Sequence, residues 1–280
     1  MKKISRRSFL AAAAVSAATL ALTACGGSAS TASSAAASSV AASSEAASTS
    51  AAAAELTTVE AGKLTMATNA TFPPYEMTTD AGTIEGIDVD TAQAIAEKLG
   101  LELQIDDMDF DAALLSVQQG KADIAMAGIT VTDERMAVMS FSDSYATGIQ
   151  SIIVPEDSDI ASADDLAGKI IGTQRGTTGY IYCTDDFGED NVIAYDDGLT
   201  AVQALNNGQV DAVVIDNAPA QEFVAANPGL KVLDTSYAEE DYAIGMAKGS
   251  SLEDAVNAAL EELKADGTLQ SIVDKYITAE

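Results

Sequence analysis

Short apolar segments of strand length alternate with amphipathic segments of helical length along most of the chain after residue 62. In the first half, this pattern predicts strands at 63–68, 102–105 and 124–127 and helices at 90–99 and 111–119. The alternation begins again after residue 150, with segments at 169–173, 180–184, 192–194, 200–206, 212–215, 219–226 and 231–233. Such alternation indicates parallel sheets covered by helices, so the expected fold class is α/β.

Two stretches of the chain follow the same plan. Residues 114–128 and 201–216 each read as a helix, a glycine, a residue pair, an aspartate and a buried strand. The glycines and aspartates are Gly120 and Asp123 in the first stretch and Gly208 and Asp211 in the second. The glycines suit the left-handed end of a helix, and the aspartates are expected to accept hydrogen bonds in turns. The repeat predicts two similar α/β lobes, with ligands beyond the carboxyl ends of their strands.

The C-terminal part of the chain is expected to connect the lobes. Residues 251–276 read as two helices separated by a turn, and residues 242–247 read as a strand whose extended partner is 151–155. These two extended segments bracket the second unit and predict a two-stranded connection, after which the tail returns to the first lobe. The expected bounds are 56–146 plus 243–280 for lobe 1 and 147–242 for lobe 2.

The N-terminal residues are typical of an exported lipoprotein. Residues 1–24 place basic residues before an apolar stretch of about 15 residues, which indicates a signal peptide. Arg6 and Arg7 look like the twin-arginine export motif, with the general secretion route as the alternative. Leu22-Thr23-Ala24-Cys25 looks like a lipobox, so Cys25 is the expected lipidation site. Residues 25–55, nearly all Ser, Ala, Thr and Gly, predict a disordered tether that holds the protein outside the cytoplasm on the cell membrane.

Charge and residue usage argue against several functional classes. The chain has 14 Lys and Arg against 43 Asp and Glu, a net charge of −29, and no histidine. This balance argues strongly against nucleic acid or an anionic lipid surface as a partner. Without histidine, Ser–His and Cys–His catalysis cannot occur and a zinc site is improbable. We therefore predict no catalytic residue, metal or cofactor, and we expect Cys183 to be a buried apolar residue.

Arg135 is the residue most suggestive of a binding site. Thr132 is a suitable helix N-cap, which places Arg135 in the first helical turn, where a positive charge is unfavourable against the helix dipole. A planar guanidinium can bind a carboxylate in a bidentate manner, and the nearby backbone around Gly128 could add N–H donors. The alternative is an ordinary surface ion pair with Asp133 or Glu134.

Other segments could complete a site for a zwitterion. The loop at 174–180 could hold an anion through its N–H groups, or be a simple strand-to-helix turn. Asp216 could accept hydrogen bonds from an ammonium group, or cap the helix that follows. Phe72 and Phe110 could cover a small ligand, or pack in the core, which is the interpretation we favour for Tyr75.

The chain resembles a known family in several motifs. These are "MATNATFPPYE", "GIDVDTAQAIAEKLG", "MDFDAALLSVQQGKADIAMAGITVTDER", "FSDSYATG", "LAGKIIGTQRGTTG", "AVQALNNGQVDAVVIDNAPA" and "LEELKADGTLQSIVDKY". From about residue 63 to residue 276 they resemble, in order, the polar amino-acid-binding proteins of bacterial ABC importers, solute-binding family 3. The resemblance implies a type II periplasmic-binding-protein fold, in which two α/β lobes joined by a two-strand hinge close around one amino acid.

The resemblance also assigns residue roles. It implies that Arg135 holds the α-carboxylate with Thr130 and Thr178, while Asp216, Gly128 and Thr130 receive the α-ammonium. The side chain of the ligand would lie between Phe72 and Phe110 and meet Asn69, Ala127 and Gln174 at its end. Thr177, beside Thr178, completes the predicted ligand-binding set.

The sequence constrains the class of ligand, a free amino acid, more closely than it constrains which amino acid is bound. Family members for cationic amino acids often carry an acid at the position of Asn69, and the glutamine-binding pattern has Lys at Gln174 and His at Ile215. Neither pattern matches, so a neutral polar amino acid is the first choice and a basic one the second. The expected protein is a monomeric, non-enzymatic lipoprotein that delivers a free L-amino acid to an ABC transporter permease. The alternative is an exported enzyme on the same fold, similar to cyclohexadienyl dehydratase.

Overall fold

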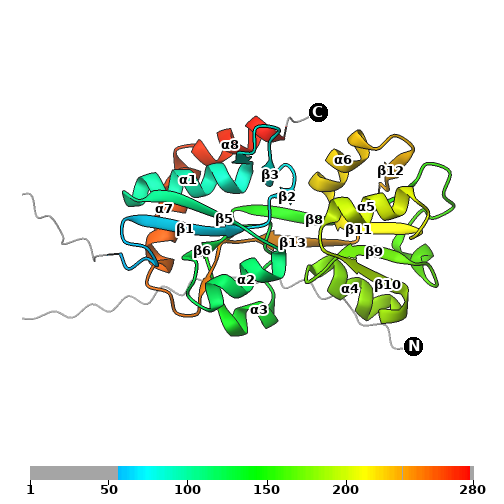
Figure 1. Ribbon diagram of the computed structural model, residues 1–280, viewed down its shortest axis with the longest axis horizontal. Coiled ribbons are helices and arrows are strands. Elements are labelled where there is room, and N and C mark those ends of the chain that lie inside the picture. Colours follow the sequence, from blue (N-terminus) through cyan, green and yellow to red (C-terminus); the bar gives the residue numbers. More distant parts are fainter. Residues whose placement is uncertain (1–55, 235, 278–280) are drawn as a thin grey trace, which may run out of the picture. The chain divides into compact units, whose positions relative to one another are not determined.

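The computed structural model describes residues 56–234 and 236–277. The predicted signal peptide, the lipidated Cys25 and the tether lie outside the described residues. The described residues belong to one compact unit, in which two main sheets each carry their own helices (Figure 1). None of the helices in this part of the chain combines the length and the apolar character needed to cross a membrane.

The first lobe is built on a five-stranded sheet of order β5-β1-β6-β14-β7. Its strands are β1 (Lys63–Thr68), β5 (Glu102–Asp107), β6 (Ile124–Ala125), β7 (Met139–Phe141) and β14 (Gly245–Ala247). The helices are α1 (Ile87–Leu99), α2 (Phe110–Gln118), α3 (Asp133–Val138), α7 (Glu253–Ala265) and α8 (Thr268–Tyr276). Figure 1 shows α1 and α2 on opposite sides of β1, with α7 and α8 beside α1. The predicted strand at 63–68 is confirmed, and β1 pairs in parallel with both β5 and β6.

A small three-stranded sheet follows β1 in the chain. It contains β2 (Thr71–Phe72), β3 (Glu76–Thr78) and β4 (Ile84–Glu85), all antiparallel. Tyr75 lies in the turn between β2 and β3 and is buried against Phe72 and Tyr242, with ring centroids 5.9 and 5.3 Å away. The expected core packing of Tyr75 is therefore confirmed.

The second lobe is built on a six-stranded sheet. Its order is β10-β9-β11-β8-β12, with β13 also paired to β8. The strands are β8 (Ala146–Pro155), β9 (Ile171–Gln174), β10 (Val192–Tyr195), β11 (Ala212–Asp216), β12 (Leu230–Val232) and β13 (Ala238–Tyr242). The helices are α4 (Thr178–Phe187), α5 (Gly198–Asn206) and α6 (Asn217–Ala226), with short 3-10 turns η1 (Ala163–Leu166) and η2 (Glu189–Asn191). Figure 1 shows α4 on one side of this sheet and α5 and α6 on the other. Cys183 of α4 is fully buried, as expected, and burial raises the pKa of its thiol to about 12.

The chain passes between the two lobes along β8 and β13. These strands are antiparallel, from Ala146 opposite Tyr242 to Gln150 opposite Ala238. The expected pairing of 242–247 with 151–155 is therefore wrong, because Gly245–Ala247 forms β14 of the first sheet and pairs with β6 and β7. The sequence did not predict β13, because the acidic residues before Tyr242 do not look like part of a buried strand.

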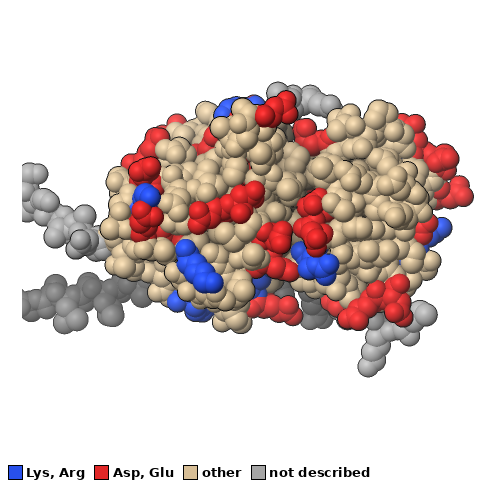
Figure 2. Space-filling view, in the orientation of Figure 1, with Lys and Arg blue, Asp and Glu red and all other residues tan. Residues whose placement is uncertain are grey.

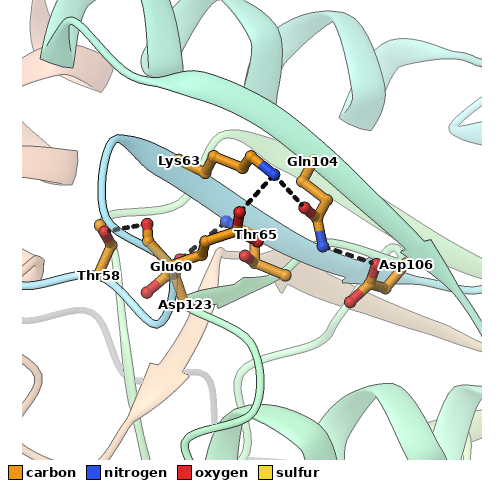
Figure 3. Close-up of polar contacts among 7 residues, drawn as sticks. All are labelled: Thr58, Glu60, Lys63, Thr65, Gln104, Asp106 and Asp123. Atoms are coloured by element: carbon orange, nitrogen blue, oxygen red, sulfur yellow. Dashed lines mark hydrogen bonds and ion pairs between the residues drawn. The ribbon is translucent and has the colours of Figure 1, made fainter.

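The two helix–strand repeats share a left-handed glycine at the end of the helix and an aspartate that accepts backbone N–H groups. Gly120 and Gly208 have φ angles of 65° and 67°, as expected for left-handed helix ends. Asp123 accepts hydrogen bonds from the backbone N–H groups of Val59 and Thr65 at 2.7 and 2.8 Å, so it ties the start of β1 to β6 (Figure 3). Asp211 accepts one from the Ile170 N–H at 2.8 Å, just before β9. Both aspartates thus accept backbone N–H groups, as expected, but the donors lie 41 to 64 residues away in the chain rather than in the local turns, so the predicted turn role is wrong.

Candidate functional site

A small cavity lies beyond the ends of the strands that the sequence singled out. It holds about 320 Å³ of space that protein atoms do not fill, including the solvent at its opening. All of the predicted ligand-binding residues line it, together with one more, Glu76. The lining residues are Asn69, Phe72, Glu76, Phe110, Ala127, Gly128, Thr130, Arg135, Gln174, Thr177, Thr178 and Asp216. The fold therefore brings together residues from both lobes at one point.

Arg135 lies where α3 begins, and Thr132 caps that helix by accepting the Arg135 N–H at 3.2 Å. The side chain is only 9% exposed. Its Nη1 donates to the Thr130 carbonyl at 2.8 Å, and its Nη2 donates to the Gly176 carbonyl of the second lobe at 3.1 Å. Its guanidinium also lies 5.4 Å from the centre of the Phe110 ring.

The surface ion pair that the sequence left open for Arg135 is wrong. Among the ion pairs of residues 56–234 and 236–277, none joins Arg135 to Asp133 or Glu134. Burial lowers the pKa of Arg135, and the nearby Glu240 carboxylate acts in the opposite direction. A buried guanidinium without a carboxylate partner in contact is suited to receive an anion from a ligand.

Asp216 is the last residue of β11 and is buried. It occupies the N-cap position of α6, yet its side chain makes no capping hydrogen bond, so the capping alternative is wrong. Its Oδ2 accepts from Gln150 Nε2 at 2.9 Å. Burial raises the pKa of Asp216 to about 7, with the Glu240 carboxylate contributing and the Tyr242 hydroxyl opposing. A cationic group placed beside Asp216 would favour its charged form.

Neutral amides and aromatic rings line the rest of the cavity. Gln174 Nε2 donates to Asn69 Oδ1 at 2.8 Å, which links the two lobes, and Asn69 Nδ2 donates to the Met108 carbonyl at 3.0 Å. Phe72 closes tightly on Gly128, where a Cβ atom would lie 2.8 Å from the ring. The cavity therefore joins a charged part, around Arg135 and Asp216, to a part lined by amides and phenyl rings.

Residues 64–279 match the family model described as bacterial extracellular solute-binding proteins, family 3. The chain belongs to this family. Among curated relatives, the L-cystine-binding protein TcyJ of Escherichia coli (strain K12) is 32% identical over 225 residues, covering 79% of this chain and 85% of the relative. The arginine-binding extracellular protein ArtP of Bacillus subtilis (strain 168) is 31% identical over 231 residues, covering 78% and 87%.

Solved structures of solute-binding proteins share the fold. An ancestral arginine-binding protein bound to glutamine is 40% identical with a TM-score of 0.75, covering 78% of this chain and 99% of that one. The arginine-, lysine-, histidine-binding protein ArtJ from Geobacillus stearothermophilus is 35% identical with a TM-score of 0.75, covering 78% and 96%. The predicted type II fold of two α/β lobes joined by a two-strand hinge is therefore confirmed.

Two acidic residues at this solute-binding site were missed in the sequence. Glu240 of β13 is 7% exposed, and its Oε2 accepts from Thr178 Oγ1 at 2.9 Å, Gln150 Nε2 at 3.0 Å and Thr130 Oγ1 at 3.1 Å. In this structure the hydroxyls of Thr130 and Thr178 are thus directed to Glu240. The acidic run "EEDY" reads as a solvated surface, although alternation of Glu240 with Tyr242 would have placed both on the buried face.

Glu76 of β3 is the second missed residue. Its side chain is fully buried, and within residues 56–234 and 236–277 neither carboxylate oxygen accepts a hydrogen bond from an N–H or from a hydroxyl group. Burial raises the pKa of Glu76 well above its ordinary value, and the adjacent Asp88 carboxylate raises it further. Asp88, in the first turn of α1, is also fully buried, and its Oδ2 accepts from the Tyr145 hydroxyl at 2.8 Å and from the Gly128 N–H at 3.0 Å. Within "PPYE" the sequence offered no signal that this glutamate lies inside.

Proposed function

We propose that this solute-binding protein captures one free amino acid by closure of its lobes and delivers it to the permease of an ABC transporter. One observation carries the proposal: a buried guanidinium, Arg135, and a buried carboxylate, Asp216, line the same small cavity. They are complementary to the carboxylate and the ammonium group that a free amino acid presents. Relatives that bind cystine, arginine and glutamine support the same class of ligand.

The α-carboxylate is assigned to Arg135. Its two hydrogen bonds to the carbonyls of Thr130 and Gly176 use only part of the donor capacity of a guanidinium. The remaining N–H groups suit a carboxylate, and the bond to Gly176 joins Arg135 to the second lobe. Ligand binding and lobe closure would therefore depend on the same side chain.

The side chain of the ligand is assigned to the amide-lined part of the cavity. Asn69 and Gln174 can each donate and accept hydrogen bonds, which favours a neutral polar amino acid. A basic amino acid is the second choice. The surplus of carboxylates around the cavity favours it, as do the acidic residues that spread over the visible surface in Figure 2.

The location follows from the family and from the N-terminal motifs. Members of the family are extracellular solute-binding proteins. We propose that residues 1–24 direct export and that lipidated Cys25 anchors a monomer to the membrane through the tether. Wild-type protein is expected to incorporate labelled palmitate and to fractionate with membranes, whereas Cys25→Ala is expected to do neither. Membrane association of Cys25→Ala equal to wild type would contradict the anchor.

The function is tested by a thermal-shift screen of the purified protein against the twenty amino acids and cystine. A ligand at 100 times its dissociation constant stabilises the folded state by about 2.7 kcal/mol. We expect large shifts for a few polar amino acids, with glutamine and arginine compared directly to decide between neutral and basic ligands. A screen in which none of them changes the unfolding temperature would contradict the proposal.

A further inference from the structure

The fully buried Glu76 side chain lines the cavity, yet neither the assigned carboxylate contact nor the assigned ammonium contact of the ligand uses it. In the described part of the chain, neither of its oxygens accepts a hydrogen bond from a nitrogen or hydroxyl donor, and Asp88 Oδ1 beside it also has no such donor. Two ionised carboxylates in this position would repel each other and remain unsatisfied. A single proton between them removes both difficulties, because one carboxyl group then donates to the other.

The surroundings decide which carboxyl group holds the proton. Asp88 Oδ2 already accepts from Tyr145 and from the Gly128 N–H, and these donors favour the anion of Asp88. Glu76 has no such donors. The groups that act on it from neighbouring elements are Asp88, Asp107 and Asp216, with Tyr75 and Tyr145 close by, and none of these is a cation. The empty site is therefore arranged to keep Glu76 neutral, with its proton directed to Asp88.

From this geometry we propose that Glu76 is a ligand-binding residue that ionises when the ammonium group of the amino acid arrives, so that binding releases its proton to solvent. This inference rests on the proposed amino-acid site. The arriving ammonium supplies the positive charge that Glu76 lacks in the empty site, and it lies between Glu76 and Asp216. The proton on Glu76 passes to buffer, and the new charge pair replaces the shared proton.

The release of a proton gives binding a definite pH dependence. Below the pKa of Glu76 in the empty site, each binding event must expel the proton, so affinity rises as pH rises. Above that pKa the proton is already absent and the contribution of Glu76 to the slope disappears. Asp216, whose pKa is about 7, adds its own dependence in the same direction, so a variant must separate the two.

Glu76→Gln makes that separation. Glutamine has the shape of the protonated glutamate and can donate an N–H to Asp88, but it cannot ionise. Calorimetric titrations at pH 6 in phosphate and in a buffer with a larger ionisation enthalpy give the number of protons released per ligand bound. We expect Glu76→Gln to release fewer protons than wild type and to bind roughly ten- to a hundredfold more weakly.

Glu85→Gln is the matched control. Glu85 lies on β4 of the same small sheet and does not line the cavity, so this variant is expected to keep the wild-type affinity and proton count. A proton count in Glu76→Gln equal to wild type would overturn the inference, whatever happens to affinity. If wild type binds no amino acid at all, the proposed function itself fails, which is a distinguishable result.

Discussion

The two helix–strand repeats, α2 with β6 and α5 with β11, are alike where they begin a strand and different where they end it. At the start, each has a left-handed glycine and an aspartate that accepts a backbone N–H from a neighbouring strand or its approach. At the carboxyl end of the first repeat, β6 stops at Ala125 and the chain continues through Gly128 to the cationic Arg135. The second repeat ends in the anion Asp216.

This difference separates folding from binding within a single motif. The aspartates that precede β6 and β11 are satisfied by backbone donors, so their charge stabilises the fold. Asp216 and Arg135 are buried, and among the residues that the structure describes neither has an oppositely charged partner in contact, an arrangement that costs stability and suits a charged ligand. Substitutions at the two ends of the repeats should therefore affect different measurements.

The largest effect is expected at the cationic end. Arg135→Ala should weaken binding of the cognate amino acid by about 2–5 kcal/mol, which is roughly 30- to several-thousand-fold, because it leaves the ligand carboxylate unpaired. Calorimetry measures the loss. Arg175→Ala is the control, because the Arg175 side chain is largely exposed and does not line the cavity. This variant should bind the ligand within about twofold of wild type. Equal losses in the two variants would contradict the assignment of Arg135.

At the anionic end, Asp216→Asn should weaken binding about ten- to a hundredfold while stabilising the empty protein. The folded pKa of Asp216 is raised to about 7 from an ordinary value of 3.8, so its contribution to stability is complete at low pH and is lost as pH rises through about 7. The unfolding temperature of ligand-free wild type should thus fall between pH 5 and pH 7 and level off above pH 7. In Asp216→Asn this fall should be smaller, and an equal fall would contradict the burial account.

Substitutions of the aspartates that precede β6 and β11 should change stability and leave ligand affinity unchanged. Asp123→Asn should lower the free energy of unfolding by about 1–3 kcal/mol, because Asp123 is buried and accepts two backbone N–H groups. Asp211→Asn should cost about 1 kcal/mol, because Asp211 is more exposed and accepts one. Denaturant unfolding measures both changes. Ligand affinity should not move in either variant, and a tenfold loss of affinity would break the separation of folding from binding.

The smallest effect on ligand affinity is expected where Gly176 of the second lobe lies against Asp111 of the first lobe. A Cβ atom at Gly176 would lie 1.7 Å from Asp111 Oδ1, whereas Gly168 has nearly the same φ angle, 76° against 74°, and nothing within 4 Å. Both alanine variants should lose about 1–2 kcal/mol of stability from backbone strain. Only Gly176→Ala should also lose affinity, by several-fold, because the exposed Asp111 side chain must turn away from the added methyl group before the lobes close. Replacing Asp111 by glycine in that variant should restore binding, and an unrestored affinity would contradict the contact.

Much of the fold could be predicted because local patterns dictate it. The alternation of strands and helices, the turn glycines and the cap of α3 all depend on residues close together in sequence. The lining of the cavity followed from the resemblance to the family, whose motifs place the residues that the structure brings together.

The parts that could not be predicted depend on contacts between distant segments. Glu76 and Glu240 look like surface charges in sequence, and only the packing of α1, β8 and β13 buries them. The assignment of residues 242–247 to one strand failed for the same reason, since the chain leaves one sheet at Tyr242 and enters another at Gly245. Periodicity reports which residues are apolar, and it does not report which sheet they join.

The central claim is that the cavity holds both ends of a free amino acid. Calorimetric titration of wild type with the cognate amino acid, its N-acetyl derivative and its carboxamide tests this directly. We expect the free amino acid to bind and each blocked form to lose at least about tenfold in affinity, because each blocked form lacks a charge that Asp216 or Arg135 would pair with. Binding of either blocked form as tightly as the free amino acid would contradict it.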